Sequence, residues 1–265
     1  MSYANNDVAK SFKALHVPGD PIILTNVWDC ISARAIGALP SAKAMATASY
    51  AVAEASGVPD SELTLETNIT AIRGISRIAR ELKKPLTVDF QDGFGDNLEE
   101  GIREVIKLGV VGINLEDYGR ELLDGKGDLY SIEQAQDRIR RVMKVAVEEG
   151  VPDFCINART DTLVVGRALS EAIERGKAYL EAGANTVFVW GGKERGGTSR
   201  AEVEALCKAF GGRLNVSLVK IRPGGLTVKE LSDIGVARMS IGPQLMLKSQ
   251  AFVAQEAEKI LSGEL

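Results

Sequence analysis

Short apolar runs alternate with longer amphipathic stretches along almost the whole chain. The runs cover residues 22–25, 44–48, 86–88, 112–115, 154–158, 186–189, 214–219 and 237–241. Each run is too short for a helix and rich in β-branched residues, which is typical of a strand buried on both faces. We therefore predict eight buried strands, one for each run.

The stretches between the runs have the periodicity of amphipathic helices, most clearly at residues 69–82, 98–108, 132–148, 169–182 and 199–209. Gly109, Gly150, Gly183 and Gly235 each follow a helical stretch, where a residue with positive φ ends a helix readily. Strands that alternate with helices favour a parallel sheet. Eight such units in 265 residues predict an α/β protein, with a single (β/α)8 TIM barrel over residues 1–265.

Residues suited to catalysis stand at or near the ends of these runs. They are Asn26, Ser49, Asp89, Glu116, Arg159, Trp190, Asn215 and Ser240. Because the active site of a (β/α)8 barrel lies where its strands end, we expect these side chains to share one rim.

The composition fits a soluble globular enzyme, with 45% apolar and 26% charged residues. A net charge of −4 argues against electrostatic binding of nucleic acid. No run approaches the roughly 20 apolar residues that span a bilayer, and the first ten residues lack the apolar core of a signal peptide. The sequence therefore predicts a cytoplasmic protein that binds neither nucleic acid nor membrane.

Carboxylates end two neighbouring strands, Asp89 in the third run and Glu116 in the fourth. In one concave mouth they would repel each other unless a cation or protons neutralised them. Oxygen ligands without a nearby histidine favour Mg²⁺ or Mn²⁺ over zinc. For Asp92, Asp96 and Asp117 an alternative stays open, because aspartate often caps the helix that follows a strand.

Arg159 and Asp161 lie in the fifth strand-end segment, INARTD. A guanidinium among acids offers a fixed fork for a substrate carboxylate or phosphonate. The alternative is an ion pair that only holds this end of the barrel together.

Taken together, these segments resemble the isocitrate lyase and phosphoenolpyruvate mutase superfamily, in particular its phosphonomutase-like group. The segments that carry the resemblance, in order, are NVWD (26–29), TASYAVAEASGVPD (47–60), VDFQDGFGD (88–96), GINLED (112–117), NARTD (157–161) and GVARMSIGP (235–243). Members of the family make or break bonds next to the C2 carbonyl of 2-oxo acids, with a divalent metal ion.

The resemblance implies a metal site for Mg²⁺ or Mn²⁺. Asp89 corresponds to the acid that holds the ion, and Glu116 and Asp60 are further groups around it. Gln91 stands where many members have a second aspartate, so it offers a carbonyl oxygen but no charge. We expect the ion to be held less tightly, unless Asp92 turns inward.

The resemblance also implies a substrate site. Ser49 and Tyr50 would offer backbone N–H groups to a carboxylate of the substrate, and Arg159 would bind the variable part. Trp190 stands where relatives frequently have a histidine, which predicts an apolar wall there, and Asn215 completes the set.

A mobile lid is expected at about residues 118–130, YGRELLDGKGDLY. This segment lacks the cysteine that the cleaving lyases of the family carry in their lid, and His16, the only histidine, precedes the first strand. Tyr118, Glu116 and a metal-bound water are therefore the candidates for a catalytic base. Lys126, between two glycines, is a further catalytic candidate, and its alternative is an exposed loop lysine.

We predict a Mg²⁺-dependent lyase that cleaves a C–C bond of a small 2-oxo or 2-hydroxy carboxylate through a pyruvate-type enolate, with oxaloacetate decarboxylation as one form. The alternatives are a phosphonate enzyme, of mutase or hydrolase type, and a barrel that binds without turnover. By resemblance we expect a homotetramer in which the last helix, residues 245–261, is exchanged between subunits; alternatively it packs on its own barrel.

Overall fold

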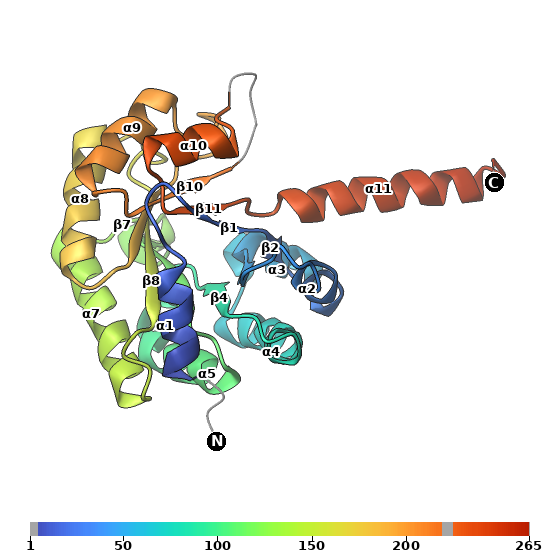
Figure 1. The fold of residues 1–265 in the computed structure, drawn as a ribbon, viewed down its shortest axis with the longest axis horizontal. Coiled ribbons are helices and arrows are strands. Elements are labelled where there is room, and N and C mark those ends of the chain that lie inside the picture. The colour runs from blue at the N-terminus through green and yellow to red at the C-terminus, as the bar shows by residue number, and fades with distance from the viewer. Residues whose placement is uncertain (1–4, 219–224, 265) are drawn as a thin grey trace.

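The computed structural model describes residues 5–218 and 225–264, and its centre is a sheet of nine parallel strands (Figure 1). These are β1 (Ile22–Leu24), β2 (Asn26–Val27), β3 (Met45–Thr47), β4 (Leu86–Asp89), β5 (Gly112–Glu116), β8 (Cys155–Thr160), β9 (Thr186–Val189), β10 (Leu214–Ser217) and β11 (Arg238–Ser240). Only Thr25 separates β1 from β2. Because β1 pairs with β11 and β2 with β3, this first segment closes the sheet into a ring. The predicted (β/α)8 barrel is confirmed.

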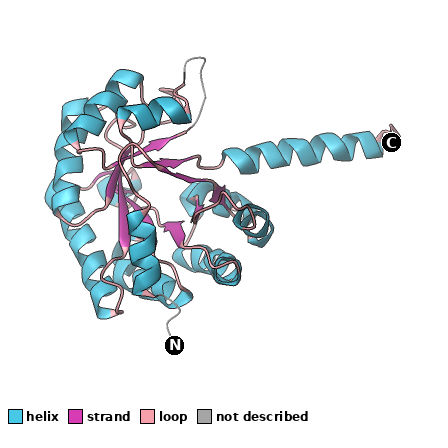
Figure 2. Ribbon diagram, viewed as in Figure 1, coloured by secondary structure: helices cyan, strands magenta, loops and turns pink. Residues whose placement is uncertain are grey.

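Helices surround the ring of strands (Figure 2). They are α2 (Cys30–Gly37), α3 (Ser49–Ala55), α4 (Leu65–Glu81), α5 (Leu98–Leu108), α7 (Ile132–Glu148), α8 (Leu169–Glu181), α9 (Arg200–Ala209) and α10 (Val228–Ile234). The expected helix ends are confirmed where φ is positive, at 100° for Gly109 and 101° for Gly235. No helix among the described residues is long and apolar enough to cross a membrane.

Most strands differ from the predicted runs by one or two residues at their ends. The fifth reaches Thr160, so Arg159 lies within β8 and not after it. The seventh predicted run extends to residue 219, which lies outside the described residues.

The inner face of the barrel is polar, although the strands are buried as predicted. In parallel register Asn114 pairs with Asn157 and Glu116 with Arg159, so these side chains share a face. Asn157 Nδ2 donates to Asn114 Oδ1 at 2.8 Å. The alternate residues, such as Ile113, belong to the apolar core that the helices cover. The barrel interior therefore departs from the bulky aliphatic filling that is usual for this fold.

Helix α1 (Asn6–Ala14) contacts β8 at the end of the barrel where β5 and β8 begin. A Cβ atom on Gly112 would lie 2.6 Å from the carbonyl oxygen of Cys155 and 3.2 Å from Cε1 of Phe12. Glycine at this position therefore allows the fully buried Phe12 ring to pack against the end of the barrel.

Helix α11 (Gln244–Leu261) extends away from the barrel (Figure 1). Met246 is its one buried residue, whereas Phe252 and Val253 are each 63% exposed and Leu261 is 83% exposed. The alternative that this helix packs on its own barrel is therefore wrong.

Candidate active site

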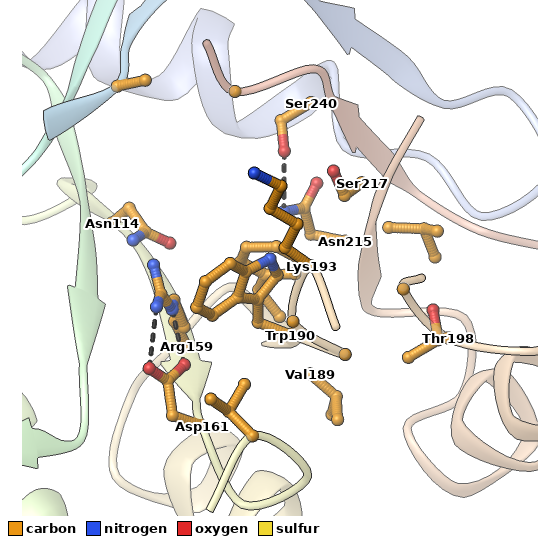
Figure 3. A pocket seen from close by; sticks show the side chains of 18 of the residues that line it. Asn114, Arg159, Asp161, Val189, Trp190, Lys193, Thr198, Asn215, Ser217 and Ser240 are labelled. Atoms are coloured by element: carbon orange, nitrogen blue, oxygen red, sulfur yellow. Dashed lines mark hydrogen bonds and ion pairs between the residues drawn. The ribbon is translucent and has the colours of Figure 1, made fainter. Parts of the chain in front are cut away.

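A cavity of about 1410 Å³ opens where the barrel strands end (Figure 3). Most of the predicted site residues line it: Ser49, Tyr50, Asp60, Asp89, Glu116, Tyr118, Arg159, Trp190 and Asn215. Gln91 and Lys126 are not among the lining residues. Gln91 is buried behind the wall, and Lys126 is exposed.

Arg159 is the centre of the charged side of the cavity. Its Nε and Nη2 donate to the two oxygens of Asp161 at 2.6 and 2.7 Å, and its Nη1 lies 3.1 Å from Oε2 of Glu116. The guanidinium also stacks over the Trp190 ring, 4.1 Å from the ring centre. Arg159 is therefore ion-paired and also lines the cavity (Figure 3), and its binding of a substrate stays a prediction.

Burial raises the pKa of Glu116 to about 8, and repulsion from Asp161 and Asp89 adds to the effect of burial. Arg159 opposes the rise but does not cancel it. Burial alone would lower the pKa of Arg159, but Asp161 and Glu116 raise it, so this guanidinium stays charged. A carboxylate in a cavity whose pKa stays raised, because its positive partner does not offset the cost of burial, is typical of a functional site.

Asp89 is fixed at the end of β4 by hydrogen bonds of its side chain and of its backbone. The backbone N–H of Ser49 donates to its Oδ2 at 2.9 Å, and Asn114 Nδ2 donates to its Oδ1 at 3.0 Å. The N–H of Asp89 itself donates to Thr47 at 2.8 Å. The Ser49 N–H, expected to bind the substrate, is therefore already used by Asp89.

Asp60 and Gln91 lie together, as a shared site requires, but the guanidinium of Arg120 contacts both of them. Arg120 Nη2 lies 3.0 Å from Oδ2 of Asp60, and Nη1 lies 3.2 Å from Oε1 of Gln91. Gln91 Nε2 also donates to Oδ1 of Asp60 at 3.1 Å, and its backbone has a φ of 48°. A non-glycine residue rarely adopts this conformation, and such residues cluster at functional sites.

The charges on this side of the cavity leave room for a divalent cation. Four carboxylates, of Asp60, Asp89, Glu116 and Asp161, lie with two guanidinium groups, of Arg120 and Arg159. When ionised they leave an excess of two negative charges. No group of three or more acidic, histidine or cysteine side chains in metal-binding proximity occurs among residues 5–218 and 225–264. The carboxylate oxygens that line this side of the cavity are donors of the kind that a hard divalent cation prefers.

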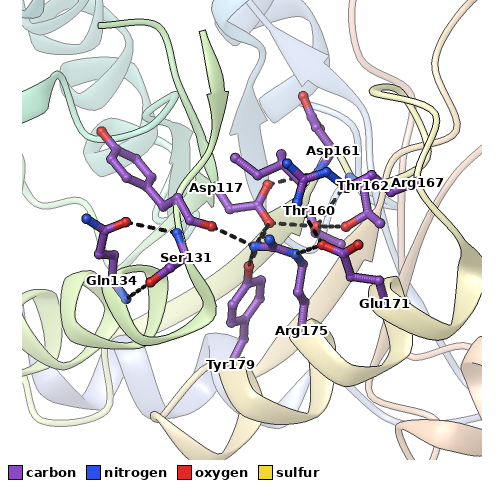
Figure 4. Close-up of polar contacts among 12 residues, drawn as sticks. Asp117, Ser131, Gln134, Thr160, Asp161, Thr162, Arg167, Glu171, Arg175 and Tyr179 are labelled. Atoms are coloured by element: carbon purple, nitrogen blue, oxygen red, sulfur yellow. Dashed lines mark hydrogen bonds and ion pairs between the residues drawn. The ribbon is translucent and has the colours of Figure 1, made fainter. Parts of the chain in front are cut away.

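Asp117 does not cap a helix and is not among the residues that line the cavity. Figure 4 shows its polar contacts. It is 2% exposed, and it accepts from Thr160 Oγ1 and Tyr179 Oη, each at 2.6 Å. The N–H of Asp161 donates to its other oxygen at 3.0 Å. Asp117 thus fixes the backbone that carries Arg159 and Asp161.

Asp92, like Asp117, is not among the residues that line the cavity. Its Oδ1 accepts from the N–H of Phe94 at 2.9 Å, and its Oδ2 accepts from Tyr130 Oη at 2.9 Å. Asp92 does not replace the missing second aspartate in this structure.

The segment expected to form a lid contains a hairpin of β6 (Tyr118–Gly119) and β7 (Asp128–Leu129), with the single turn α6 (Leu122–Gly125) between them. Tyr118 Oη donates to the carbonyl of Lys126 at 3.2 Å. This places Tyr118 at the cavity and leaves the Lys126 side chain outside it.

The cavity residues that sequence reasoning missed include three polar ones close to the predicted site: Asn114, Arg120 and Arg238. For Asn114 and Arg238 a signal was available, because polar and apolar residues alternate in GINLE and in RMS with the period of a strand. Arg120 had no signal, because it approaches Asp60 only through the hairpin.

The fold and the site define a (β/α)8 barrel with an acidic, oxygen-rich cavity at its strand ends. Residues 12–261 match the sequence model of the phosphoenolpyruvate phosphomutase family. The chain belongs to this family, which confirms the resemblance drawn from its motifs.

Several relatives are similar over part or all of the chain. A Mycobacterium tuberculosis protein is 30% identical over 257 residues, which cover 96% of this chain and 90% of the relative. The 2-methylisocitrate lyase of Escherichia coli is 37% identical over 139 residues, 50% of this chain and 45% of the lyase. The 2,3-dimethylmalate lyase of Eubacterium barkeri is 32% identical over 63% of this chain and 58% of its own.

Solved structures share the whole fold. A Burkholderia cenocepacia protein described as a candidate phosphonomutase is 33% identical, with a TM-score of 0.84 over 97% of this chain and 99% of its own. Oxaloacetate acetylhydrolase in complex with oxalate has a TM-score of 0.83 over 97% of this chain and 88% of its own. Its identity of 23% shows a common fold only.

Proposed function

We propose that this protein is a divalent-metal-dependent lyase that cleaves a C–C bond of a small 2-oxo or 2-hydroxy carboxylate. The observation that carries the proposal is the charged side of the cavity, where Arg159 bridges Glu116 and Asp161 beside Asp89. A guanidinium and a cation next to one another suit a substrate with two oxygen-rich ends. The relatives named as 2-methylisocitrate lyase and 2,3-dimethylmalate lyase support this class of reaction.

Asp89 is the proposed main ligand of Mg²⁺ or Mn²⁺, with Glu116, Asp60 and Gln91 around the ion. Each oxygen of Asp89 accepts one hydrogen bond and keeps a second lone pair for a cation. Bound there, the cation would stabilise the negative charge that develops on the C2 oxygen of the substrate as a pyruvate-type enolate forms.

The side chains of the cavity favour decarboxylation among the lyase reactions. Cavity lining from the described residues includes neither histidine nor cysteine, the groups that most readily move protons near neutral pH. Loss of CO₂ from a 2-oxo dicarboxylate needs no base, whereas cleavage of a 2-hydroxy acid does. Tyr118 and Glu116 are the proposed groups for that proton, and Arg159 and Tyr50 orient the substrate beside Trp190 and Asn215.

We propose that the hairpin segment 118–130 acts as the lid, with Lys126 entering only when it closes.

The experiment is a panel of oxaloacetate, 2-methylisocitrate, 2,3-dimethylmalate and phosphonopyruvate, with Mg²⁺ and with excess chelator. Metal alone is the reference, because divalent ions decarboxylate oxaloacetate unaided. We expect chelator-sensitive pyruvate release above that reference, and its loss in Asp89→Asn. Phosphate from phosphonopyruvate would move the assignment to a phosphonate enzyme. Tight binding of these acids without any product would indicate a barrel that only binds.

We also propose that the protein works in the cytoplasm as a homo-oligomer, with four subunits by analogy. The exposed apolar residues of α11, Phe252 and Val253 among them, have no cover within the described chain. Sedimentation should therefore give more than one subunit, and a monomer at micromolar concentration would refute the exchange of α11.

A further inference from the structure

The floor of the cavity holds Arg238, an arginine that has no ion-pair partner among the described residues. Arg238 begins β11, is 3% exposed, and lines the cavity. Within residues 5–218 and 225–264 it makes no ion pair, and its one polar contact is Nη1 to His16 Nε2 at 3.5 Å. This contrasts with Arg159, the other lumen arginine, which has two carboxylate partners.

The thiol of Cys155 and the imidazole of His16 do not neutralise Arg238, and the negative charge of Asp89 acts on it without forming an ion pair. Burial raises the pKa of the Cys155 thiol to about 12, so the thiol stays protonated. Burial, and then the charge of Arg238, lower the pKa of His16 to about 4, so this imidazole is neutral and accepts from Arg238. Burial lowers the pKa of Arg238 itself to about 10, which leaves it charged at neutral pH. A buried charge without a partner is costly, and an anion in contact would offset that cost.

The geometry of the guanidinium indicates where such an anion would bind. Nη1 faces His16, whereas the opposite edge, formed by Nε and Nη2, has no partner among the described residues, and Nε is buried. This edge is the fork that binds a carboxylate with two parallel hydrogen bonds. The Nε–H has no hydrogen-bond partner, and together with the unpaired charge it indicates that a ligand binds at this edge.

Asn215 is the register neighbour of Arg238 on the adjacent strand β10. It is 1% exposed and lines the same cavity. Its Nδ2 contacts Ser240 Oγ at 3.3 Å, and its Oδ1 has no partner. A half-turn of the amide would let Oδ1 accept from Ser240 and would present the NH₂ group toward the cavity.

We propose that Arg238 and Asn215 form a second anion site on the cavity floor, for a planar monoanion of the carboxylate type, separate from Arg159. The anion has two sources, a free ion from solution or one carboxylate of a bound dicarboxylate. The same fork serves both.

The test is thermal unfolding of the wild type in rising formate, with a bulky morpholine sulfonate buffer keeping the ionic strength constant. We expect Tm to rise with the logarithm of the formate concentration once it exceeds Kd, by about 5 °C at formate about 100 times above its Kd. Arg238→Met should abolish the rise, and Arg103→Met, which removes a surface arginine paired with Glu148, should keep it. A wild type whose Tm does not rise with formate, or an equal rise in Arg238→Met, would overturn the proposal.

Two further measurements guard the result. If Arg238→Met does not fold, Arg238→Lys keeps the charge but lacks the fork, and an unchanged formate response would then overturn the proposal. In crystals soaked in bromide we expect an anomalous peak between Arg238 Nε and Asn215, and a peak only at Arg159 refutes it. To identify the source of the anion, dicarboxylates from malonate to glutarate are titrated into the protein with formate bound. Displacement of formate would assign the Arg238 site to one carboxylate of the substrate, and no displacement would assign it to a free anion.

Discussion

Arg159 Nη1 lies 3.1 Å from Glu116 Oε2, across a pair of neighbouring strands. The same guanidinium binds Asp161 through its other edge, and its side chain is only 15% exposed. One buried guanidinium therefore pairs with two carboxylates, and its flat face stacks on the Trp190 ring. This arrangement fixes the position of the charge before any substrate arrives.

Replacing Arg159 by lysine should weaken substrate use strongly. A lysine has neither the fork that holds Asp161 nor the plane that stacks on Trp190. We expect kcat/KM to fall on the order of 10- to 100-fold, the loss expected for one charged hydrogen-bond pair. Steady-state kinetics on the substrate found by the panel would measure it. Arg167→Lys is the matched control, since Arg167 also pairs with two acids but lies outside the cavity.

Removing Arg120 should tighten metal binding. Arg120→Leu takes one positive charge from beside Asp60 and Gln91, which are then free to face the ion. We expect the Kd of Mn²⁺ to fall about tenfold, a modest change because the pair is partly exposed. Titration followed by electron paramagnetic resonance would measure free Mn²⁺. Arg195→Leu is the control, because Arg195 lines the cavity but pairs with Glu202. Weaker binding in Arg120→Leu would mean that Arg120 organises the site.

Asp117 is predicted to matter for stability more than for chemistry. In Asp117→Asn an NH₂ group would replace one of the oxygens that accept from Tyr179, Thr160 or the Asp161 N–H, and the charge that faces Arg175 would be lost. We expect the free energy of unfolding to fall by about 3 kcal/mol, the size found when one partner of a buried ion pair is removed. Urea unfolding would measure it. Asp153→Asn removes a more exposed ion pair with Lys13 and should cost less than about 1 kcal/mol; equal losses would contradict the prediction.

His16 predicts how stability depends on pH. Its pKa is lowered to about 4 by burial and by Arg238, from an ordinary value of 6.5. The unfolded chain therefore binds a proton between these values while the folded chain does not, so stability is full above about pH 6.5 and falls toward pH 4. The loss has an upper bound of about 3 kcal/mol. Unfolding curves of His16→Gln should lack this part of the acid loss, and an identical pH profile in both proteins would exclude His16 as its source.

The eight strands, five of the helices and the ends of those helices could be predicted from the sequence, because each depends on local periodicity and on residues such as Gly109 and Gly235. The strand-end rule also predicted that Asp89, Glu116 and Arg159 would share one rim. It holds because parallel strands in a closed barrel all end on the same side.

The partners of these residues were decided by the tertiary structure alone. That Arg120 enters the cluster of Asp60 and Gln91, and that Asp117 anchors Tyr179 instead of capping a helix, depends on segments far apart in the sequence. The tertiary structure alone also decided that Arg238 lies in the polar lumen of the barrel without an ion-pair partner among the described residues. The sequence determined which residues reach the barrel mouth, since strand period and chain direction are local. Only the closed barrel decided which charges meet, because electrostatic contacts depend on distance in space and not along the chain.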